Sequence, residues 1–334
     1  MIIDCHAHVS APAKLWAYKA TLLAHRGAHG RGKVVISDDE LVDALNTPTM
    51  GKYGHLPYLK ENGIDKQCVS PRPFQMMHSE SPAKIVDWLH AEVHNVIYRQ
   101  TQMYPDTFVG VAGLSQVAGR PIEDALPELE RAVNELGFRG CLLNPDPYEN
   151  GAVEAPGLGE KYWYPLYEKL CELDIPAHIH SAGSRSERTA YSLHFINEET
   201  IAIQNLMKST VYDDFPDLKI ICSHGGGAIP YQIGRFDAGT ARGKGLPFRE
   251  KIKKMYFDTV LYSPAALELL IKEIGADNLL FGAECPGVGS SHNAATGRPY
   301  DDIKPYIDGF EWLSDEDRTK IYSGNSIKIF GLDK

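Results

Sequence analysis

Two histidines close to the start of the chain are the residues whose type and spacing point most directly to chemistry. They occur in the segment Asp4-Cys5-His6-Ala7-His8. Alternate side chains of an extended strand point to the same face, so Asp4, His6 and His8 are expected to share one face. Two imidazoles placed in this way are suitable ligands for Zn²⁺ or a similar ion. Alone, the pair is equally compatible with two ordinary histidines, so the metal hypothesis depends on further ligands.

Candidate partners occur in two later apolar segments. His178 and His180 again share one strand face, and His180 lies nearer the carboxyl end of its segment. We therefore expect His180 to bind the metal and His178 to be a hydrogen-bonded interior histidine. Glu284 is the only carboxylate in residues 281–286. A carboxylate in an apolar strand is costly unless it binds a cation or forms a buried ion pair, and we favour the ligand role.

The predicted metal site therefore consists of His6, His8, His180 and Glu284. Imidazole nitrogen and carboxylate oxygen suit Zn²⁺, with Mn²⁺ as the alternative, and an open coordination position can hold water. The fourth strand ends in Asn144 and offers no lysine that could bridge two metals as a carbamate. A single ion is therefore predicted.

His224 is the candidate general acid/base. It precedes three glycines, Gly225-Gly226-Gly227, which allow close backbone approach. The same four-residue pattern occurs in oxyanion holes of α/β-hydrolases, but the G-x-S-x-G elbow of those enzymes is absent from this chain. We therefore expect His224 to move a proton beside the metal, with Glu284 and Tyr191 as further catalytic candidates. A helix-capping or supporting role is the alternative for His224.

Several residues at or after predicted strand ends are candidates for substrate binding. Arginine binds carboxylates in a forked geometry, so an acidic substrate would be held by arginines of this set, unless they are solvated surface charges. Tyr191 and His194 are expected in the loop after the fifth strand, where they would supply a phenol and an imidazole. The candidates are Arg72, Arg185, Arg188, Arg235, Tyr191 and His194.

The elements that position these residues alternate between strand and helix. Strands are expected at residues 1–9, 65–73, 107–115, 139–146, 175–181, 219–226, 255–262 and 279–285, and helices at 81–104, 121–136, 163–173, 197–209 and 264–274. This alternation predicts an α/β fold of the (β/α)8 TIM-barrel type, in which chemistry lies at the carboxyl ends of the strands. A doubly wound sheet is the competitor, but no G-x-G-x-x-G follows the first strand. We expect one domain over residues 1–334, with a long excursion at about residues 10–40 covering the barrel mouth.

The composition of the chain limits the classes of partner that it can be expected to bind. The 334 residues have a net charge of −10 and no basic block, which argues against nucleic acid. There is no apolar run long enough for a membrane span and no secretory signal pattern. The six cysteines include no C-x-x-C pair and favour reduced thiols, so a cytoplasmic enzyme is expected. The oligomeric state stays open, with a homo-oligomer as one outcome.

The whole chain resembles the amidohydrolase superfamily. The resemblance rests on the D-x-H-x-H start, on His180 followed by Gly183-Ser184, on the segment 224–230 (HGGGAIP) and on Glu284. It is greatest to the branch that contains aminocarboxymuconate semialdehyde decarboxylase, the γ-resorcylate-type decarboxylases and 4-oxalomesaconate hydratase. Segments 10–12, 15–20, 23–27, 72–77 and 191–197 are similar to the metal-dependent hydrolases of meta-cleavage products in biphenyl catabolism.

The resemblance implies zinc on His6, His8, His180 and Glu284, with Arg72, Tyr191, His224 and Arg235 around the substrate. It implies a Zn²⁺-dependent hydrolase that cleaves a C–C bond in the ring-fission product of a substituted catechol or biphenyl acid, a carboxylated aromatic or dienoate compound. A nonoxidative decarboxylase and a hydratase of a 4-oxalomesaconate-like acid are the alternatives, and a non-catalytic zinc-binding protein is the rival from another class.

Two departures led us to place the hydratase second. The chain reads Gly287 to His292 where the hydratase has an arginine, and Tyr262-Ser263-Pro264 where it has a Tyr-His pair. A glutamate rather than an aspartate at position 284 weighs against the decarboxylases.

Overall fold

Parallel strands form the centre of the molecule. The structure is a computed structural model and describes residues 1–151, 153–241 and 245–333. Its central strands are β1 (Ile3–His8), β2 (Lys66–Ser70), β3 (Phe108–Gly110), β4 (Ala112–Gly113), β5 (Cys141–Leu143), β6 (Ala177–Ile179), β7 (Ile220–Cys222), β8 (Tyr256–Asp258) and β9 (Leu279–Leu280). Each lies parallel to its neighbours in the orders β1-β2-β3 and β4-β5-β6-β7-β8-β9.

Hydrogen bonds join these two sheets into a barrel. β3 and β4 are halves of one strand interrupted at Val111, whose N–H still donates to the Val69 carbonyl at 2.9 Å. At the other seam, Cys5 N–H donates to Phe281 O at 2.8 Å, and Glu284 N–H donates to His6 O at 2.9 Å. Counting β3 and β4 as one, eight strand positions close the barrel within the described residues. The predicted (β/α)8 architecture is confirmed.

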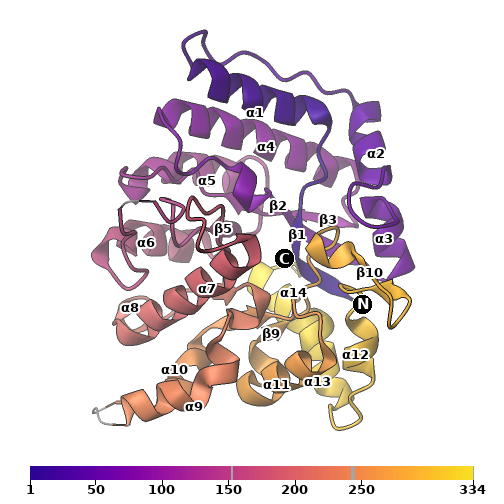
Figure 1. Cartoon of the computed structure of the whole chain (residues 1–334), viewed down its shortest axis with the longest axis vertical. Helices are drawn as coiled ribbons and strands as arrows, with labels where there is room; N and C mark the ends of the chain where they lie inside the picture. The colour runs from indigo at the N-terminus through magenta and orange to yellow at the C-terminus, as the bar shows by residue number, and fades with distance from the viewer. Residues whose placement is uncertain (152, 242–244, 334) are drawn as a thin grey trace.

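Helices surround the barrel (Figure 1). They are α1 (Ala13–His25), α2 (Asp38–Asn46), α3 (His55–Glu61), α4 (Ala83–Met103), α5 (Leu126–Asn134), α6 (Tyr164–Leu173), α7 (Tyr191–Lys208), α8 (Val211–Asp214), α9 (Ile229–Thr240), α10 (Phe248–Lys251), α11 (Pro264–Ile274), α12 (Lys304–Asp308), α13 (Asp315–Thr319) and α14 (Asn325–Phe330). The five predicted helices all occur, but α7 begins at Tyr191 instead of residue 197. A short antiparallel pair, β10 (His292–Asn293) and β11 (Arg298–Pro299), follows the last barrel strand.

The first excursion is longer than predicted and is itself helical. It contains α1, α2 and α3 and returns to the barrel at Lys66. α1 lies alongside α4 in the outer layer (Figure 1). α2 begins with a capping box, in which Ser37 Oγ accepts from Glu40 N–H and the Glu40 side chain accepts from Ser37 N–H. Coverage of the barrel mouth by residues 10–40 stays a prediction.

The first strand, β1, carries polar side chains into the barrel interior. All six of its residues are buried. Ile3 belongs to the apolar interior, whereas Asp4, His6 and His8 are buried although they are polar. Such groups need partners in the interior, because burial removes their hydrogen bonds to water. Their partners define the functional site.

The described residues hold no disulfide, since all six cysteines are free. None of the described helices has the length and hydropathy that a membrane span requires.

Candidate metal centre and active site

Three imidazoles leave one nitrogen each without a hydrogen-bond partner in the barrel interior. These atoms are the Nε2 nitrogens of His6, His8 and His180, all of them buried. The rings lie 4.9 to 5.1 Å apart, centroid to centroid. Buried polar atoms normally have partners, so three unpartnered nitrogens side by side indicate a missing shared partner. A metal ion would supply it, because neutral imidazole nitrogen is a common ligand of divalent transition metals.

The opposite nitrogen of each ring is held by the protein. His6 Nδ1 lies 2.7 Å from Asp258 Oδ2, and His180 Nδ1 lies 2.6 Å from Ser181 O. His8 Nδ1 lies 3.0 Å from both Ser70 Oγ and the Pro71 carbonyl. Metal-binding histidines usually donate their second N–H to such acceptors, which fix the ring and its tautomer. The arrangement leaves Nε2 as the free acceptor on all three rings.

Burial also keeps two of these rings neutral. It lowers the pKa of His8 to about 4, although Glu284 acts in the opposite direction. Burial likewise lowers the pKa of His180 well below the ordinary value for histidine, and the nearby His6 adds to that effect. A metal ligand has to be the neutral imidazole, so these rings need not lose a proton to bind an ion near neutral pH.

Glu284 supplies the carboxylate of the group. Its Oε1 lies 3.6 Å from His8 Nε2, and its Oε2 accepts a hydrogen bond of 2.9 Å from the Tyr262 hydroxyl. Burial alone would raise the pKa of Glu284, but the neighbouring imidazoles of His224 and His8 outweigh it and hold the pKa well below the usual range. The side chain is therefore an anion in a buried position. Its backbone has a positive φ of 57°, a strained conformation for a residue other than glycine.

His224 lies at the edge of the same group. Its Nδ1 is 2.8 Å from Glu199 Oε1, and its Nε2 is 3.6 Å from Glu284 Oε2. Burial would lower the pKa of His224, but the charge of Glu199 and hydrogen bonds to both glutamates raise it well above the ordinary value. Like Glu284, His224 has a positive φ, here 50°. Strained backbone of this kind clusters at functional sites.

Two sets of four ligands can be drawn from these five residues. The ligand atoms of His6, His180, His224 and Glu284 all lie within 4.8 Å of one another. The predicted set contains His8 in place of His224. The Nε2 of His8 is buried and unpartnered, whereas the Nε2 of His224 is not among the unpartnered buried atoms and His224 lines a cavity. This difference favours His8 as a ligand and His224 as the group that faces substrate.

A cavity of about 520 Å³ opens beside the group. Its wall is mostly apolar and aromatic and, among the described residues, includes no lysine or arginine. It is lined by Tyr191, Ser192, Phe195, Ile196, His224, Val260, Leu261, Tyr262, Glu284, Val288, Gly289, Ser291 and Tyr300. Tyr191, one of the predicted site residues, is 47% exposed and lies at this wall, where burial raises its pKa to about 12.

Arg72 interacts electrostatically with two residues of the cavity wall. Burial lowers its pKa, while the charges of Glu284 and Tyr191 oppose that change. Its Nε donates to Val9 O at 3.2 Å. Within the described part of the chain Arg72 forms no ion pair shorter than 4.0 Å. An arginine without a carboxylate partner at this position suits an anionic substrate.

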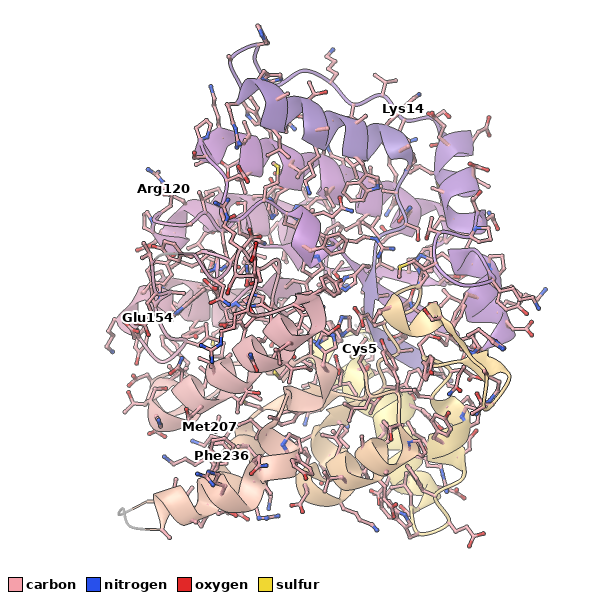
Figure 2. The ribbon with its side chains drawn as sticks, viewed as in Figure 1. Cys5, Lys14, Arg120, Glu154, Met207 and Phe236 are labelled. Atoms are coloured by element: carbon pink, nitrogen blue, oxygen red, sulfur yellow. The ribbon has the colours of Figure 1, made fainter. Side chains whose placement is uncertain are left out.

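The structure does not bring three predicted substrate contacts to this cavity. Arg235 is exposed on α9 and lines a separate hollow with Met207 and Phe236. Figure 2 shows these two residues at the lower left, away from Cys5 of β1 near the centre. Arg185 is exposed and bonds to Ser79 and Glu80.

His194 is fully buried and is not part of the cavity wall. Because α7 already begins at Tyr191, His194 lies within this helix, and neither of its ring nitrogens has a hydrogen-bond partner among the described residues. Tyr191 and His194 thus lie in the first helical turn, not in the predicted loop. Arg188, a further candidate, is exposed at a different hollow.

Sequence reasoning missed three residues of the site. Asp258, in β8, bonds to His6 Nδ1 at 2.7 Å and to His178 Nε2 at 3.3 Å. His178 is therefore the hydrogen-bonded interior histidine that the sequence predicted. Asp258 is a carboxylate inside an apolar strand, the same signal that pointed to Glu284. Glu199 and Tyr262 had no comparable signal, because their roles depend on which helix and loop pack beside β7 and β9.

The chain matches the family described as Amidohydrolase over residues 3–332. It belongs to that family. It is 37% identical to 2-keto-4-carboxy-3-hexenedioate hydratase from Sphingobium sp., over 99% of this chain and 96% of the relative. The solved structure of 4-oxalomesaconate hydratase from Rhodopseudomonas palustris superposes with a TM-score of 0.89 and 33% identity, over 100% of this chain and 97% of that one.

A more distant amidohydrolase structure shares the fold. Dihydroxybenzoic acid decarboxylase from Polaromonas sp., solved with bound manganese and 2-nitroresorcinol, has a TM-score of 0.75 and 23% identity, over 100% of this chain and 97% of that one. Together with the buried histidines and glutamate, the family indicates that this chain is a metal-dependent enzyme.

These relatives correct the expected reaction. The similarity over nearly the full chain is to hydratases, so the prediction of a hydrolase that cleaves C–C bonds is wrong and its hydratase alternative is better supported. The departures that argued for the hydrolase lie in the cavity wall, because Tyr262, Val288 and Gly289 line the cavity. They lie outside the group His6, His8, His180 and Glu284.

Proposed function

We propose that this amidohydrolase is a metal-dependent hydratase, a C–O lyase that adds water to a C=C bond conjugated with a carbonyl in a small, ring-derived carboxylic acid. The observation that supports it most is the arrangement of the group: His6, His8 and His180 present three unpartnered nitrogens, and Glu284 lies between them and His224. The similarity to two hydratases supports the reaction class.

The three histidines and Glu284 would hold one divalent ion, with Zn²⁺ favoured by the nitrogen-rich donor set and Mn²⁺ as the alternative. When bound, such an ion polarises a carbonyl and lowers the pKa of water. Asp258, Ser70 and the Ser181 carbonyl keep the three rings oriented through their Nδ1 atoms.

The remaining residues act on the substrate. Arg72 would bind its carboxylate, and the apolar wall with Tyr191 and Phe195 would cover the carbon body and exclude water. Hydration forms a C–O bond at the carbon distant from the carbonyl and places a proton on the carbon next to it. His224 Nε2 faces both Glu284 and the cavity, so His224 would transfer that proton, and Glu284 would accept the proton that water loses.

The test is a product analysis with metal-analysed enzyme and a conjugated keto acid, beginning with 2-keto-4-carboxy-3-hexenedioate and an aryl-substituted dienoate. Hydration removes the ultraviolet absorbance of the conjugated system and adds the mass of one water without breaking the chain. Loss of CO₂ would identify a decarboxylase instead, and two fragments would exclude a hydratase.

One single variant and one matched pair make this test specific. His224→Ala should lower kcat by about 10²- to 10⁴-fold while the metal content stays unchanged, because the ring is a proton carrier and not a ligand. An unchanged rate in that variant would favour a non-catalytic metal-binding protein. Arg72→Met should raise KM, whereas Arg185→Met, which removes an exposed arginine paired with Glu80, should not.

A further inference from the structure

One face of α7 contacts His224 both at the face of its ring and at its Nδ1 atom. Tyr191, Phe195 and Glu199 are spaced four residues apart, so they lie along the same side of the helix. Tyr191 lines the cavity, and the Phe195 ring stacks with the imidazole of His224 at 5.9 Å and an interplanar angle of 12°. One turn further, Glu199 Oε1 lies 2.8 Å from His224 Nδ1. α7 crosses in front of the barrel strands in Figure 1.

Glu199 is unusual among the residues of this helix. Its side chain is fully buried, and its second oxygen, Oε2, has no hydrogen-bond partner. Burying a carboxylate is costly, so a glutamate retained here with one side-chain partner indicates that the partner matters. The preceding residue, Glu198, points elsewhere and lines a separate hollow with Asp146 and Asn205.

We propose that Glu199 is a positioning residue for His224. By accepting a hydrogen bond from Nδ1–H it fixes one ring orientation, and it selects the Nδ1-protonated tautomer once the ring has given up its Nε2 proton, so that Nε2 is the nitrogen that faces Glu284 and the cavity. The ring of Phe195 is stacked on the imidazole of His224 and restricts its rotation about the Cβ–Cγ bond. The effect of this arrangement on turnover rests on the proposed hydration, but the tautomer of His224 does not.

The backbone around His224 is docked on α7 independently of the Glu199 side chain. Ala228 N–H donates to Thr200 Oγ1 at 2.9 Å. Gly227 has a φ of 62°, and a Cβ atom there would lie 2.6 Å from the Ile196 carbonyl, so only glycine allows this approach. Replacing the carboxylate of Glu199 by an amide of equal size should therefore leave the turn in place.

The experiment compares Glu199→Gln with Glu198→Gln in the metal-loaded enzyme. Both variants remove one negative charge from neighbouring positions of one helix, but only Glu199 contacts His224. Glu199→Gln should lower kcat by about 10²-fold, change KM much less and shift the pH profile, at unchanged metal content. Glu198→Gln should match the wild type. Glu199→Asp, which keeps a carboxylate, should restore the wild-type pH profile at a reduced rate.

A second readout does not depend on turnover. Nitrogen-15 NMR of the imidazoles, recorded at a pH high enough for His224 to be neutral and with His224→Ala to assign the signals, should show protonated Nδ1 on His224 in the wild type and in Glu198→Gln, and a changed tautomer ratio in Glu199→Gln. An unchanged tautomer and kcat in Glu199→Gln would overturn the proposal, as would equal losses in the two glutamine variants. If no acid is hydrated but the tautomer changes, the positioning role stands and the proposed function fails.

Discussion

Two groups of histidines in this molecule have similar ring contacts but differ in what their nitrogens do. The inner group is His6, His8 and His180, at the carboxyl ends of barrel strands, with centroids 4.9 to 5.1 Å apart. The outer group consists of His78, His90 and His94. Its successive rings meet edge to face at 5.6 and 6.2 Å.

In the outer group, among the described residues, a single buried ring nitrogen, His90 Nε2, lacks a hydrogen-bond partner, whereas the inner group has three such nitrogens. His94 Nε2 accepts from Gly113 N–H at 2.8 Å, and its Nδ1 bonds to Glu128 Oε1 at 2.6 Å. His78 and His90 use Nδ1 on the carbonyls of Gln116 and Val86. Two groups of side chains within the described residues could hold a metal ion, one of four residues and one of three. Neither group includes His78, His90 or His94. Ring proximity alone therefore does not make a metal site; several unpartnered nitrogens beside a carboxylate do.

The strongest test of this distinction removes one ring from each group. His6→Ala should abolish stoichiometric metal binding and lower the rate of the proposed hydration by more than about 10³-fold, because the remaining ligands no longer surround an ion. His90→Ala should keep the metal and lose about 1–3 kcal/mol of stability through a cavity and a lost hydrogen bond. Metal analysis, kinetics and denaturant unfolding of both variants measure this. Metal retained by His6→Ala would show that the inner group is not the binding site.

A weaker perturbation acts on the carboxylates behind the rings. Asp258→Asn should weaken metal binding by about 10- to 100-fold, because Asp258 orients His6 and His178 through Oδ2. Glu128→Gln is its counterpart, since Glu128 supports His94 in the same way in the outer group. Competition with a chelator gives the affinities. Equal metal loss in both variants would mean that general destabilisation, rather than ligand orientation, is responsible.

Much of the barrel and the metal group could be predicted from the sequence because both depend on local patterns. Eight apolar segments specified the strands, and period-two spacing placed His6 and His8 on one face. The same rule placed His178 and His180 on one face, and depth along the strand separated their roles. Glu284 was recognisable as a charge in an apolar segment.

The cavity wall could not be predicted in the same way. Arg235 follows the HGGG segment closely, but α9 carries it to the outer surface. His194 and Tyr191 are three residues apart, yet only Tyr191 reaches the cavity, because a helix begins there instead of a loop. Glu199 meets His224 only through the packing of α7 on the turn after β7. These relationships depend on how distant segments pack together, and no regular spacing of residues in the sequence indicates that packing.

The smallest expected effect is a pH-dependent difference in stability within the outer group. Burial lowers the pKa of His90 to about 3, well below the ordinary value of about 6.5 for histidine in an unfolded chain. The folded state therefore binds fewer protons than the unfolded state between these values, so the free energy of unfolding is greatest above about pH 6.5 and falls as the pH is lowered. Metal-free protein gives the appropriate comparison, because proton competition with a bound ion is then absent.

Replacing His90 by glutamine removes this titration and retains a polar side chain of similar length. Between about pH 7.5 and pH 5.5, the wild type should lose about 1.4 kcal/mol more of its unfolding free energy than His90→Gln, as urea unfolding at the two pH values would measure. Burial also lowers the pKa of His8 and His180 in the inner group. These residues are present in both proteins, so their contributions cancel when the two changes in unfolding free energy are compared. A wild type and variant with the same pH slope would mean that His90 binds a proton equally readily in the folded and the unfolded protein, so that burial of a ring whose Nε2 has no partner would not lower its pKa.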